Sequence, residues 1–444
     1  MQQEQIKTSL PENAYRELKA GEEYEPVMGA QSQPKEVTPY SVTLGIIMAV
    51  LFSAAAAYLG LKVGQVFEAA IPIAIIAVGL GQMRGKKNML GQNVIIQSIG
   101  ASSGVIVAGA IFTLPALYIL GLDEVYFYQV FLSSLLGGIL GIVLLIPFRK
   151  YFVKEMHGKY PFPEATATTE VLVSGEKGGS QAKILVIAGL IGGLYDFIVS
   201  TFGAWVSSLS TTMWGWGQAL AAKVKLTFGI NTSAAVLGLG YIIGLKYALI
   251  IAAGSALVWF FIVPLVGSFE SVVDAEAMVA MLGITKEELI ADPSLLFTPE
   301  NLFTYIGQPI GIGGIAMAGL IGIIRQAGII RQAVGLAVSE LTSKKGGSVI
   351  AVERTQRDLP MKLILSVLIA ALISCWVFFH FGLLGNGLQS IVALLIVFVI
   401  AFLFTTVAAN AIAIVGTNPV SGMTLMTLIL SSLVLVSVGL SGAE

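Results

Sequence analysis

The sequence predicts an all-α fold, a polytopic membrane helical bundle, and three properties of the chain support this fold class. Of the 444 residues, 56% are hydrophobic and 11% are charged, whereas a soluble domain carries about 25% charged residues. The mean hydropathy is +0.87. Apolar runs long enough to cross a bilayer as helices recur from residue 41 to the end of the chain. These properties exclude an ordinary water-soluble domain.

About ten apolar runs are candidate membrane spans, because only helices and closed barrels satisfy their backbone hydrogen bonds in lipid. They lie at 41–61, 66–83, 93–119, 127–147, 183–205, 233–266, 301–324, 361–384, 388–413 and 420–440. The run at 233–266 is too long for one ordinary span, and Gly244, Lys246 and Gly254 interrupt it. We therefore predict a discontinuous or re-entrant region there.

The distribution of lysine and arginine predicts the orientation of the chain in the membrane. The stretches 84–87, 149–183 and 325–362 are basic, whereas the loop at 267–300 is acidic. Because basic loops stay in the cytoplasm, we predict a multi-pass protein of a bacterial inner membrane with a cytoplasmic N-terminus. Lys223 and Lys225 fall on the wrong side in this topology and count against it.

The domain prediction separates a polar tail from two membrane parts. Residues 1–38 are highly charged and are predicted to be a disordered cytoplasmic tail. Phe52–Gly64 resembles Phe404–Gly416 at a constant offset. If this is a true repeat, residues 39–385 are a first transmembrane repeat unit and 386–444 the start of a second. The chain would then cover only the N-terminal part of a longer protein. A chance match between two helices of small residues is the open alternative.

Several classes of function have no support in the sequence. The formal net charge of −1 gives no basis for binding nucleic acid. One cysteine and two histidines make a disulfide framework or a Cys- or His-based metal site improbable, and we predict no metal and no cofactor. No phosphate-binding loop of the Gly-x-x-x-x-Gly-Lys type is present. No recognisable catalytic pair is present either, so an enzyme ranks last.

Residues 159–172, Lys-Tyr-Pro-Phe-Pro-Glu-Ala-Thr-Ala-Thr-Thr-Glu-Val-Leu, form the most specific stretch. Pro163 suits the first position of a helix, and a carboxylate in the first turn, at Glu164, is favoured by the helix dipole. Glu164, Thr166 and Thr168 are therefore candidates to bind substrate in a polar cavity, and Glu164 is also a candidate for proton coupling. A capped helix on a cytoplasmic loop is the alternative.

The stretch 416–422, Gly-Thr-Asn-Pro-Val-Ser-Gly, separates two apolar runs and cannot stay helical throughout, because proline disfavours it. Unwound backbone at membrane depth is tolerated where it lines a cavity. Asn418 and Ser421 are therefore substrate-binding candidates. Glu68 occupies a similar position in the proposed first unit and is a candidate to carry a proton. A tight surface turn at 416–422 and an interfacial charge at Glu68 are the alternatives.

Two further sets of polar residues lie inside apolar runs. Asn93, Gln97 and Ser102 form a polar stripe that must face protein or water. They are candidates for a wall of the substrate cavity, with helix–helix packing as the alternative. Asp196 lies in the middle of the run at 183–205. A carboxylate there is costly in lipid, which makes Asp196 the first candidate for proton coupling; a pair with a lysine or with backbone groups is the alternative.

Four stretches resemble, in the same order, those of the oligopeptide transporter (OPT) family, which includes the yellow-stripe-like metal-chelate transporters. They are Tyr160–Ala167 with Glu170-Val-Leu after it, Asn93–Gly104, Gly238–Gly244 and Gly416–Thr424. The resemblance covers roughly residues 40–440 and implies a proton-coupled symporter of oligopeptides or metal-chelating, peptide-like compounds. It also implies two halves with more spans than this chain can hold. Tyr241, in the third stretch, joins the candidate substrate-binding residues.

The combined prediction is a proton-coupled secondary transporter that imports oligopeptides or peptide-like metal chelates. Its expected partners are the small substrate, protons and the lipid bilayer, without nucleic acid, and homo-oligomerisation is left open. The alternative is a passive pore or a membrane scaffold subunit without transport of its own. Substrate identity does not follow from the sequence.

Overall fold

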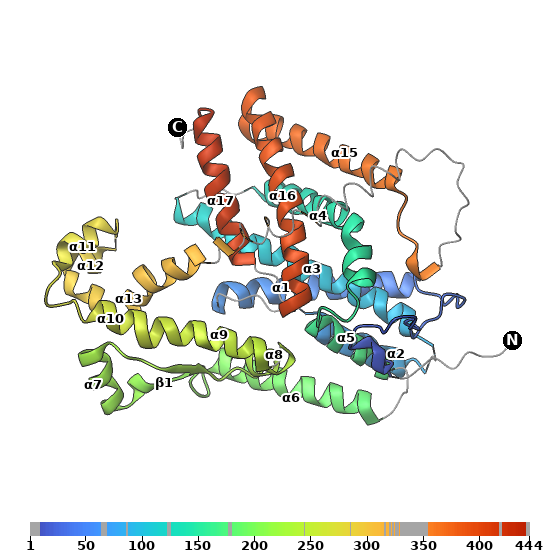
Figure 1. Cartoon of the computed structure of the whole chain (residues 1–444), viewed down its shortest axis with the longest axis horizontal. Coiled ribbons are helices and arrows are strands. Elements are labelled where there is room, and N and C mark those ends of the chain that lie inside the picture. The colour runs from blue at the N-terminus through green and yellow to red at the C-terminus, as the bar shows by residue number, and fades with distance from the viewer. Residues whose placement is uncertain are drawn as a thin grey trace. The chain divides into compact units, whose positions relative to one another are not determined.

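The computed structural model describes nearly the whole chain except for short gaps and one longer one (Figure 1). The described residues are 9–63, 69–85, 88–121, 126–175, 180–243, 245–284, 286–314, 317, 318, 321, 324, 328, 354–416 and 420–440. Within them the chain is helical apart from loops, short turns and one two-stranded ribbon.

Six described helices are long and apolar enough to cross a membrane. They are Pro39–Tyr58, Leu90–Ile119, Phe127–Glu155, Ala248–Gly267, Arg354–Leu384 and Gly387–Ile414. Shorter apolar helices are Ala70–Met83, Ile187–Phe202 and Gly422–Ser437. Each predicted apolar run contains described helical residues. Of the run at 301–324, the structure describes only a part. The prediction of an all-α polytopic membrane fold is confirmed.

The chain forms two compact units. The first comprises Met1–Val186 and Gly319–Glu444, and the second comprises Ile187–Ala318. This division does not coincide with the predicted boundary between 385 and 386, and the predicted internal repeat stays a prediction.

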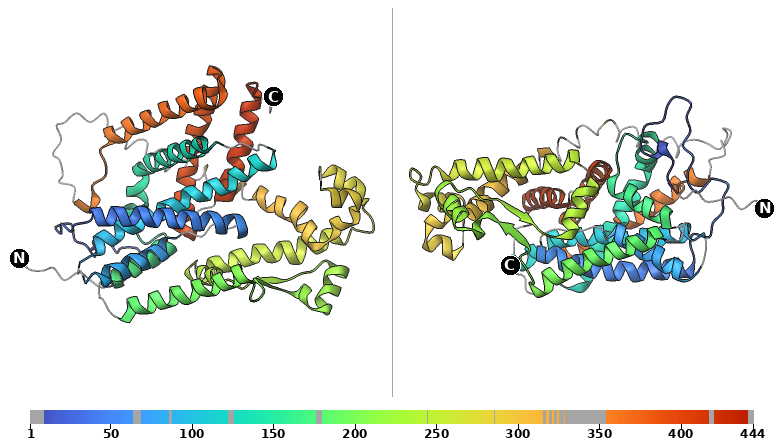
Figure 2. Two further views of the ribbon diagram at one scale, coloured as in Figure 1. Left: turned by 180° about the vertical axis from the view of Figure 1, so that it is seen from behind. Right: turned by 90° about the horizontal axis from the view of Figure 1, so that it is seen from below.

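The described part of the first unit consists of α-helices and four short helical segments. Its elements are η1 (Glu12–Ala14), α1 (Pro39–Val63), α2 (Ala70–Met83), α3 (Leu90–Ile119), α4 (Phe127–Lys150), η2 (Tyr151–Glu155), α5 (Pro163–Gly175), η7 (Arg354–Gln356), α15 (Met361–Phe379), η8 (His380–Leu384), α16 (Gly387–Val415) and α17 (Val420–Ser437). The helix α1 lies along α3, and α2 packs against both α3 and α5 (Figure 2). The helix α4 packs against α15 and α16.

Glycines allow the close approach of helices in this unit. A Cβ atom at Gly100 of α3 would lie 2.8 Å from Ile73 Cδ1 of α2, and one at Gly175 of α5 would lie 2.4 Å from Val78 Cγ1 of α2. Such small residues bring helix backbones together in membranes, where van der Waals packing drives association. The packing of α3 and α5 on α2 fixes the relative positions of the two helices that carry most of the candidate polar residues.

The second unit contains shorter elements and begins inside helix α6 (Ser180–Phe202). The others are β1 (Ser208–Ser210), η3 (Thr211–Met213), α7 (Gly215–Val224), β2 (Gly229–Asn231), α8 (Ala234–Ile243), α9 (Leu245–Leu257), η4 (Val258–Ile262), α10 (Val263–Gly267), α11 (Ala275–Met281), α12 (Glu287–Ala291), η5 (Pro293–Phe297), α13 (Pro299–Leu302) and η6 (Phe303–Gly307). Strands β1 and β2 pair antiparallel, with Leu209 opposite Ile230. Helix α8 ends at Ile243 and α9 begins at Leu245; Gly244 lies outside the described residues.

The acidic segment after α10 has its own small core. Val263, Leu289, Leu296, Phe297 and Leu302 are almost fully buried together. Lys225, one of the two lysines that counted against the predicted topology, forms an ion pair of 2.7 Å with Glu270 of this segment.

The described part of the predicted disordered tail, residues 9–38, has an irregular backbone with defined contacts. Leu10, Val27 and Met28 pack against a buried cluster that α2, α3 and α5 form. We call residues 10–28 the N-terminal strap. Its few apolar side chains meet an apolar surface, which favours their burial.

Candidate functional site

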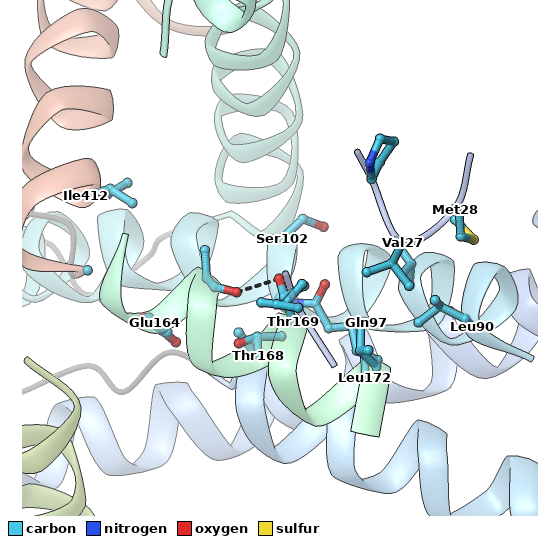
Figure 3. A pocket seen from close by; sticks show the side chains of 18 of the residues that line it. Val27, Met28, Leu90, Gln97, Ser102, Glu164, Thr168, Thr169, Leu172 and Ile412 are labelled. Carbon is cyan, nitrogen blue, oxygen red and sulfur yellow. Dashed lines mark hydrogen bonds between the residues drawn. The ribbon is translucent and has the colours of Figure 1, made fainter. Parts of the chain in front are cut away.

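A cavity of about 610 Å³ lies within the first unit. Its walls come from α3, α5, the end of α16 and the N-terminal strap (Figure 3). Most lining side chains are apolar; the polar ones are Tyr24, Gln97, Ser102, Glu164, Thr168, Thr169 and Thr355. A mainly apolar cavity of this size with a few convergent polar groups is typical of a small-molecule site.

Helix α5 begins next to the end of α16. The backbone N–H of Phe162 donates to the carbonyl oxygen of Ala413 at 3.0 Å. Phe162 has a φ of +40°, a conformation that is uncommon for a bulky residue and costs about 1–3 kcal/mol. Pro163 follows as the first residue of α5, where its missing N–H and fixed φ favour the helix. The Pro-Phe-Pro segment therefore sets the direction in which α5 leaves the membrane-spanning helices.

Gly416 brings the two most specific sequence stretches into contact. It ends α16 with a φ of +88°, and it also lines the cavity. A Cβ atom at this position would lie 2.9 Å from Pro163 Cγ and 3.4 Å from Glu164 Cβ. Both the backbone conformation and the close approach require glycine. Gly416 and the start of α5 thus meet at the cavity wall.

Glu164 lies in the first turn of α5 and is half-buried on the cavity wall. The dipole of α5 favours a carboxylate at this position. Among the described lining residues, Glu164 is the only acidic one, and none is basic. The cavity therefore suits a ligand with a positively charged group.

Thr168 follows Glu164 by one helical turn and lines the same cavity. Its side chain is 4% exposed, and its Oγ1 atom has no hydrogen-bond partner among the described residues. The neighbouring hydroxyls differ: Thr166 donates to the Pro161 carbonyl at 3.2 Å, and Thr169 donates to the Ala165 carbonyl at 2.7 Å. Buried hydroxyls are nearly always hydrogen-bonded, so the Thr168 hydroxyl is an unusual group on this wall.

The polar stripe of α3 is divided between two environments. Gln97 and Ser102 line the cavity, although the Ser102 hydroxyl also donates to the Ile99 carbonyl at 2.8 Å. Asn93 is 3% exposed and lies beside Gly81 of α2. It is not among the lining residues, and its Oδ1 atom has no partner among the described residues. The predicted set Glu164, Thr168, Gln97 and Ser102 is thus brought together, while Asn93 lies between helices and Thr166 lies beside the cavity.

Asp196 is in the second unit, on α6. Its carboxylate accepts a hydrogen bond of 3.1 Å from the Ser233 hydroxyl and one of 2.8 Å from the backbone N–H of Ala234. Ala234 is the first residue of α8, so Asp196 caps the start of that helix from a neighbouring element. This is the pairing with backbone groups that the sequence left open; a role in proton coupling stays a prediction.

Of the four other candidates, the structure describes the side chain of one. Tyr241 of α8 is 90% exposed and belongs to the second unit. Glu68 and Asn418 lie outside the described residues, and of Ser421 only the helical backbone is described. In the part of the chain that is described, no group of three or more His, Cys, Asp or Glu side chains could hold a metal ion.

The N-terminal strap contributes lining residues that the sequence reasoning missed. Leu10, Tyr24, Pro26, Val27 and Met28 all face the cavity. The available signal was the short apolar run Pro26-Val-Met28 within an otherwise polar tail.

Polar contacts hold the strap in a folded loop. The Arg16 guanidinium forms two hydrogen bonds of 2.8 Å with Glu22, and these, with the Lys19 backbone N–H, hold the pKa of the Glu22 carboxyl at about 2. The Tyr15 hydroxyl donates to Glu170 of α5, and this hydrogen bond raises the pKa of Tyr15 to about 12.

The apolar spanning helices define a polytopic membrane protein, and the first unit contains a cavity with a few polar groups. Residues 36–442 match the family described as "OPT oligopeptide transporter protein". The chain belongs to this family, which confirms the resemblance seen in the sequence.

One curated relative is similar over most of the chain. It is a protein of Haemophilus influenzae described as "Putative oligopeptide transporter", 28% identical over 394 residues. The alignment covers 86% of this chain and 58% of the relative, so the chain spans less than two thirds of the relative's length. No solved structure matches the chain.

Proposed function

We propose that this chain acts in proton-coupled import of oligopeptides, as a secondary transporter in a bacterial inner membrane with its N-terminus in the cytoplasm. Family membership supports transport of oligopeptides and favours transport over catalysis. The observation that carries the proposal is the position of two polar groups on the wall of one cavity, one helical turn apart. They are the Glu164 carboxylate and the Thr168 hydroxyl, which has no hydrogen-bond partner among the described residues.

A peptide matches these groups. Its amino terminus is a cation that a carboxylate binds with a charge-assisted hydrogen bond, worth about 1.5–3 kcal/mol. Its backbone amides can pair with the Thr168 hydroxyl and the Gln97 side chain. The rest of the wall is apolar, so it can contact the peptide's apolar side chains without burying polar groups that lack a hydrogen bond. A passive pore or scaffold would gain nothing from a buried hydroxyl left without a partner.

Peptides suit the cavity better than anionic metal chelates do. The described lining residues include one carboxylate and no lysine or arginine. An anionic chelate would meet like charge at Glu164, which is unfavourable in a partly buried site. We therefore propose peptides with a free amine as the substrate class.

Proton coupling is proposed to act through Glu164. An ionised carboxylate holds the peptide amine, and protonation of the same carboxylate removes the charge attraction and releases the peptide. Binding and release then depend on the proton gradient at a single side chain. Asp196, which caps α8, is the second candidate.

Uptake of radiolabelled tri-alanine into proteoliposomes tests this function. We expect accumulation when the pH gradient is imposed and its loss when a protonophore removes the gradient. Glu164→Gln should weaken uptake about 10- to 100-fold, the equivalent of a charge-assisted hydrogen bond. Glu155→Gln is the matched control, because Glu155 is exposed and does not line the cavity. Accumulation that ignores the gradient, or equal effects of the two variants, would contradict the proposal.

A further inference from the structure

The N-terminal strap supplies one end of the cavity. Figure 3 shows Val27, Met28 and Leu90 towards one end and Glu164 towards the other. Leu172 lies two turns beyond Glu164 on α5, a separation of about 12 Å along the helix axis. An extended chain of three to four residues covers about this distance. A peptide bound by its amine at Glu164 would therefore bring a later side chain to the strap.

This end of the cavity is apolar. Val27 and Met28 of the strap pack against the cluster that includes Leu90 and Leu172 while also lining the cavity. The described lining residues of the strap carry no charge. Within the strap, Glu22 forms an ion pair with Arg16. An apolar side chain gains about 25 cal/mol for each Å² it buries here, whereas a carboxylate would lose its hydration without a partner.

Specific contacts hold the strap against α5 and against the loop at 157–158. The Tyr15 hydroxyl donates to Glu170 of α5 at 2.5 Å. His157 Nε2 lies 2.8 Å from the Asn13 carbonyl oxygen, and its ring packs against Tyr24 with centroids 4.9 Å apart. Gly158 permits this approach, since a Cβ atom there would lie 2.1 Å from the Arg16 carbonyl carbon. These contacts hold the strap in a defined position at this end of the cavity.

We propose that the N-terminal strap is the part of the peptide site that selects an apolar side chain at the end opposite Glu164. This inference rests on the proposed function, because it requires a peptide in the cavity. It assigns specificity to residues 10–28, which precede the first membrane span and lie outside the motif stretches.

Competing uptake of two tripeptides with amidated C-termini, Ala-Ala-Leu and Ala-Ala-Asp, tests the strap, because amidation removes the terminal carboxylate that the apolar end would otherwise have to accommodate. We expect wild-type protein to prefer Ala-Ala-Leu by about tenfold. The double variant Val27→Asn/Met28→Gln should take up the two peptides about equally. Val37→Asn is the matched control, because Val37 is 71% exposed in the same terminal segment and does not line the cavity; it should keep the wild-type preference. The ratio of two substrates in one sample is independent of how much protein folds.

A second variant releases the strap without changing its lining residues. Tyr15→Phe/Glu170→Gln removes the charged hydrogen bond to α5, and it should lower the preference in the same direction. Glu164→Gln should weaken uptake of both peptides equally and leave their ratio unchanged. If wild-type protein takes up neither peptide, the proposed function itself fails, and this inference with it. If it takes up both and the strap variants keep the tenfold ratio, only the strap proposal is overturned.

Discussion

Glu164 and Asp196 are both candidates for proton coupling in the sequence, yet they have different surroundings in the structure. Glu164 lies in the first turn of α5, beside an unpartnered hydroxyl, on a cavity wall. Asp196 accepts hydrogen bonds from Ser233 and Ala234 and caps α8. The cost of a carboxylate in an apolar run can be recognised from sequence. What offsets that cost, a ligand or a structural partner, depends on residues that are distant in the chain.

The largest expected effect concerns the contact that positions Glu164. Gly416→Val places a β-branched residue at a φ of +88° and against Pro163. The backbone strain costs about 1–3 kcal/mol, and the overpacking adds about 1–3 kcal/mol. We expect loss of measurable tri-alanine uptake. Gly109→Ala in α3 is the control, because nothing lies within 4 Å of a Cβ atom there, and it should transport normally. Normal uptake by Gly416→Val would mean that α5 and α16 need not meet.

The next effect separates the two carboxylates directly. Asp196→Ala removes a cap from α8, which should lower the free energy of unfolding by about 0.5–2 kcal/mol. Peptide affinity of the folded fraction should stay unchanged. Glu164→Gln should show the reverse pattern, with weak binding and only the small loss of stability, about 0.3–1 kcal/mol, that removing a carboxylate from a first helical turn causes. Thermal unfolding and equilibrium binding of tri-alanine on the same samples measure both quantities. An Asp196 variant that is stable but transports without regard to the pH gradient would instead make Asp196 the proton carrier.

A smaller effect distinguishes two hydroxyls of one helix. Thr168→Val should weaken peptide binding about two- to tenfold, the value of one neutral hydrogen bond. It should leave stability unchanged or raise it, because it removes a buried hydroxyl without a partner. Thr166→Val is the matched variant, since Thr166 already donates to Pro161; binding should persist. Equal binding losses in both variants would show that Thr168 has no special role.

The smallest effect is the pH dependence of the strap. The Glu22 pKa is lowered from 4.5 to about 2, so ionised Glu22 stabilises the folded strap. This contribution is fully present above about pH 4.5 and is lost as the pH falls through about 2. Hydrogen exchange of residues 10–28 in wild type and Glu22→Gln should therefore differ at pH 7 and converge near pH 2. A difference that grows on acidification would reverse the assigned sign.

The fold class and the motif residues were predictable because they depend on local patterns. Apolar runs of span length identify membrane helices without knowledge of their neighbours. The position of Glu164 at a helix start follows from Pro163 before it. By contrast, the contact of Gly416 with Pro163 joins residues that are far apart in the chain, and composition carries no signal for it. The strap was missed because a charged tail is typical of disorder, whereas its three apolar side chains pack on α2, α3 and α5, which are distant in the chain.

The central claim is that Glu164 binds the amine of a peptide. The most direct test measures binding of tri-alanine and N-acetyl-tri-alanine to wild-type protein and to Glu164→Gln. Acetylation removes the positive charge of the amine, so it should weaken binding to wild type about tenfold or more. The same acetylation should have little effect on Glu164→Gln, because the interaction is already absent. If acetylation weakens binding equally in both proteins, Glu164 does not hold the amine and the account is contradicted.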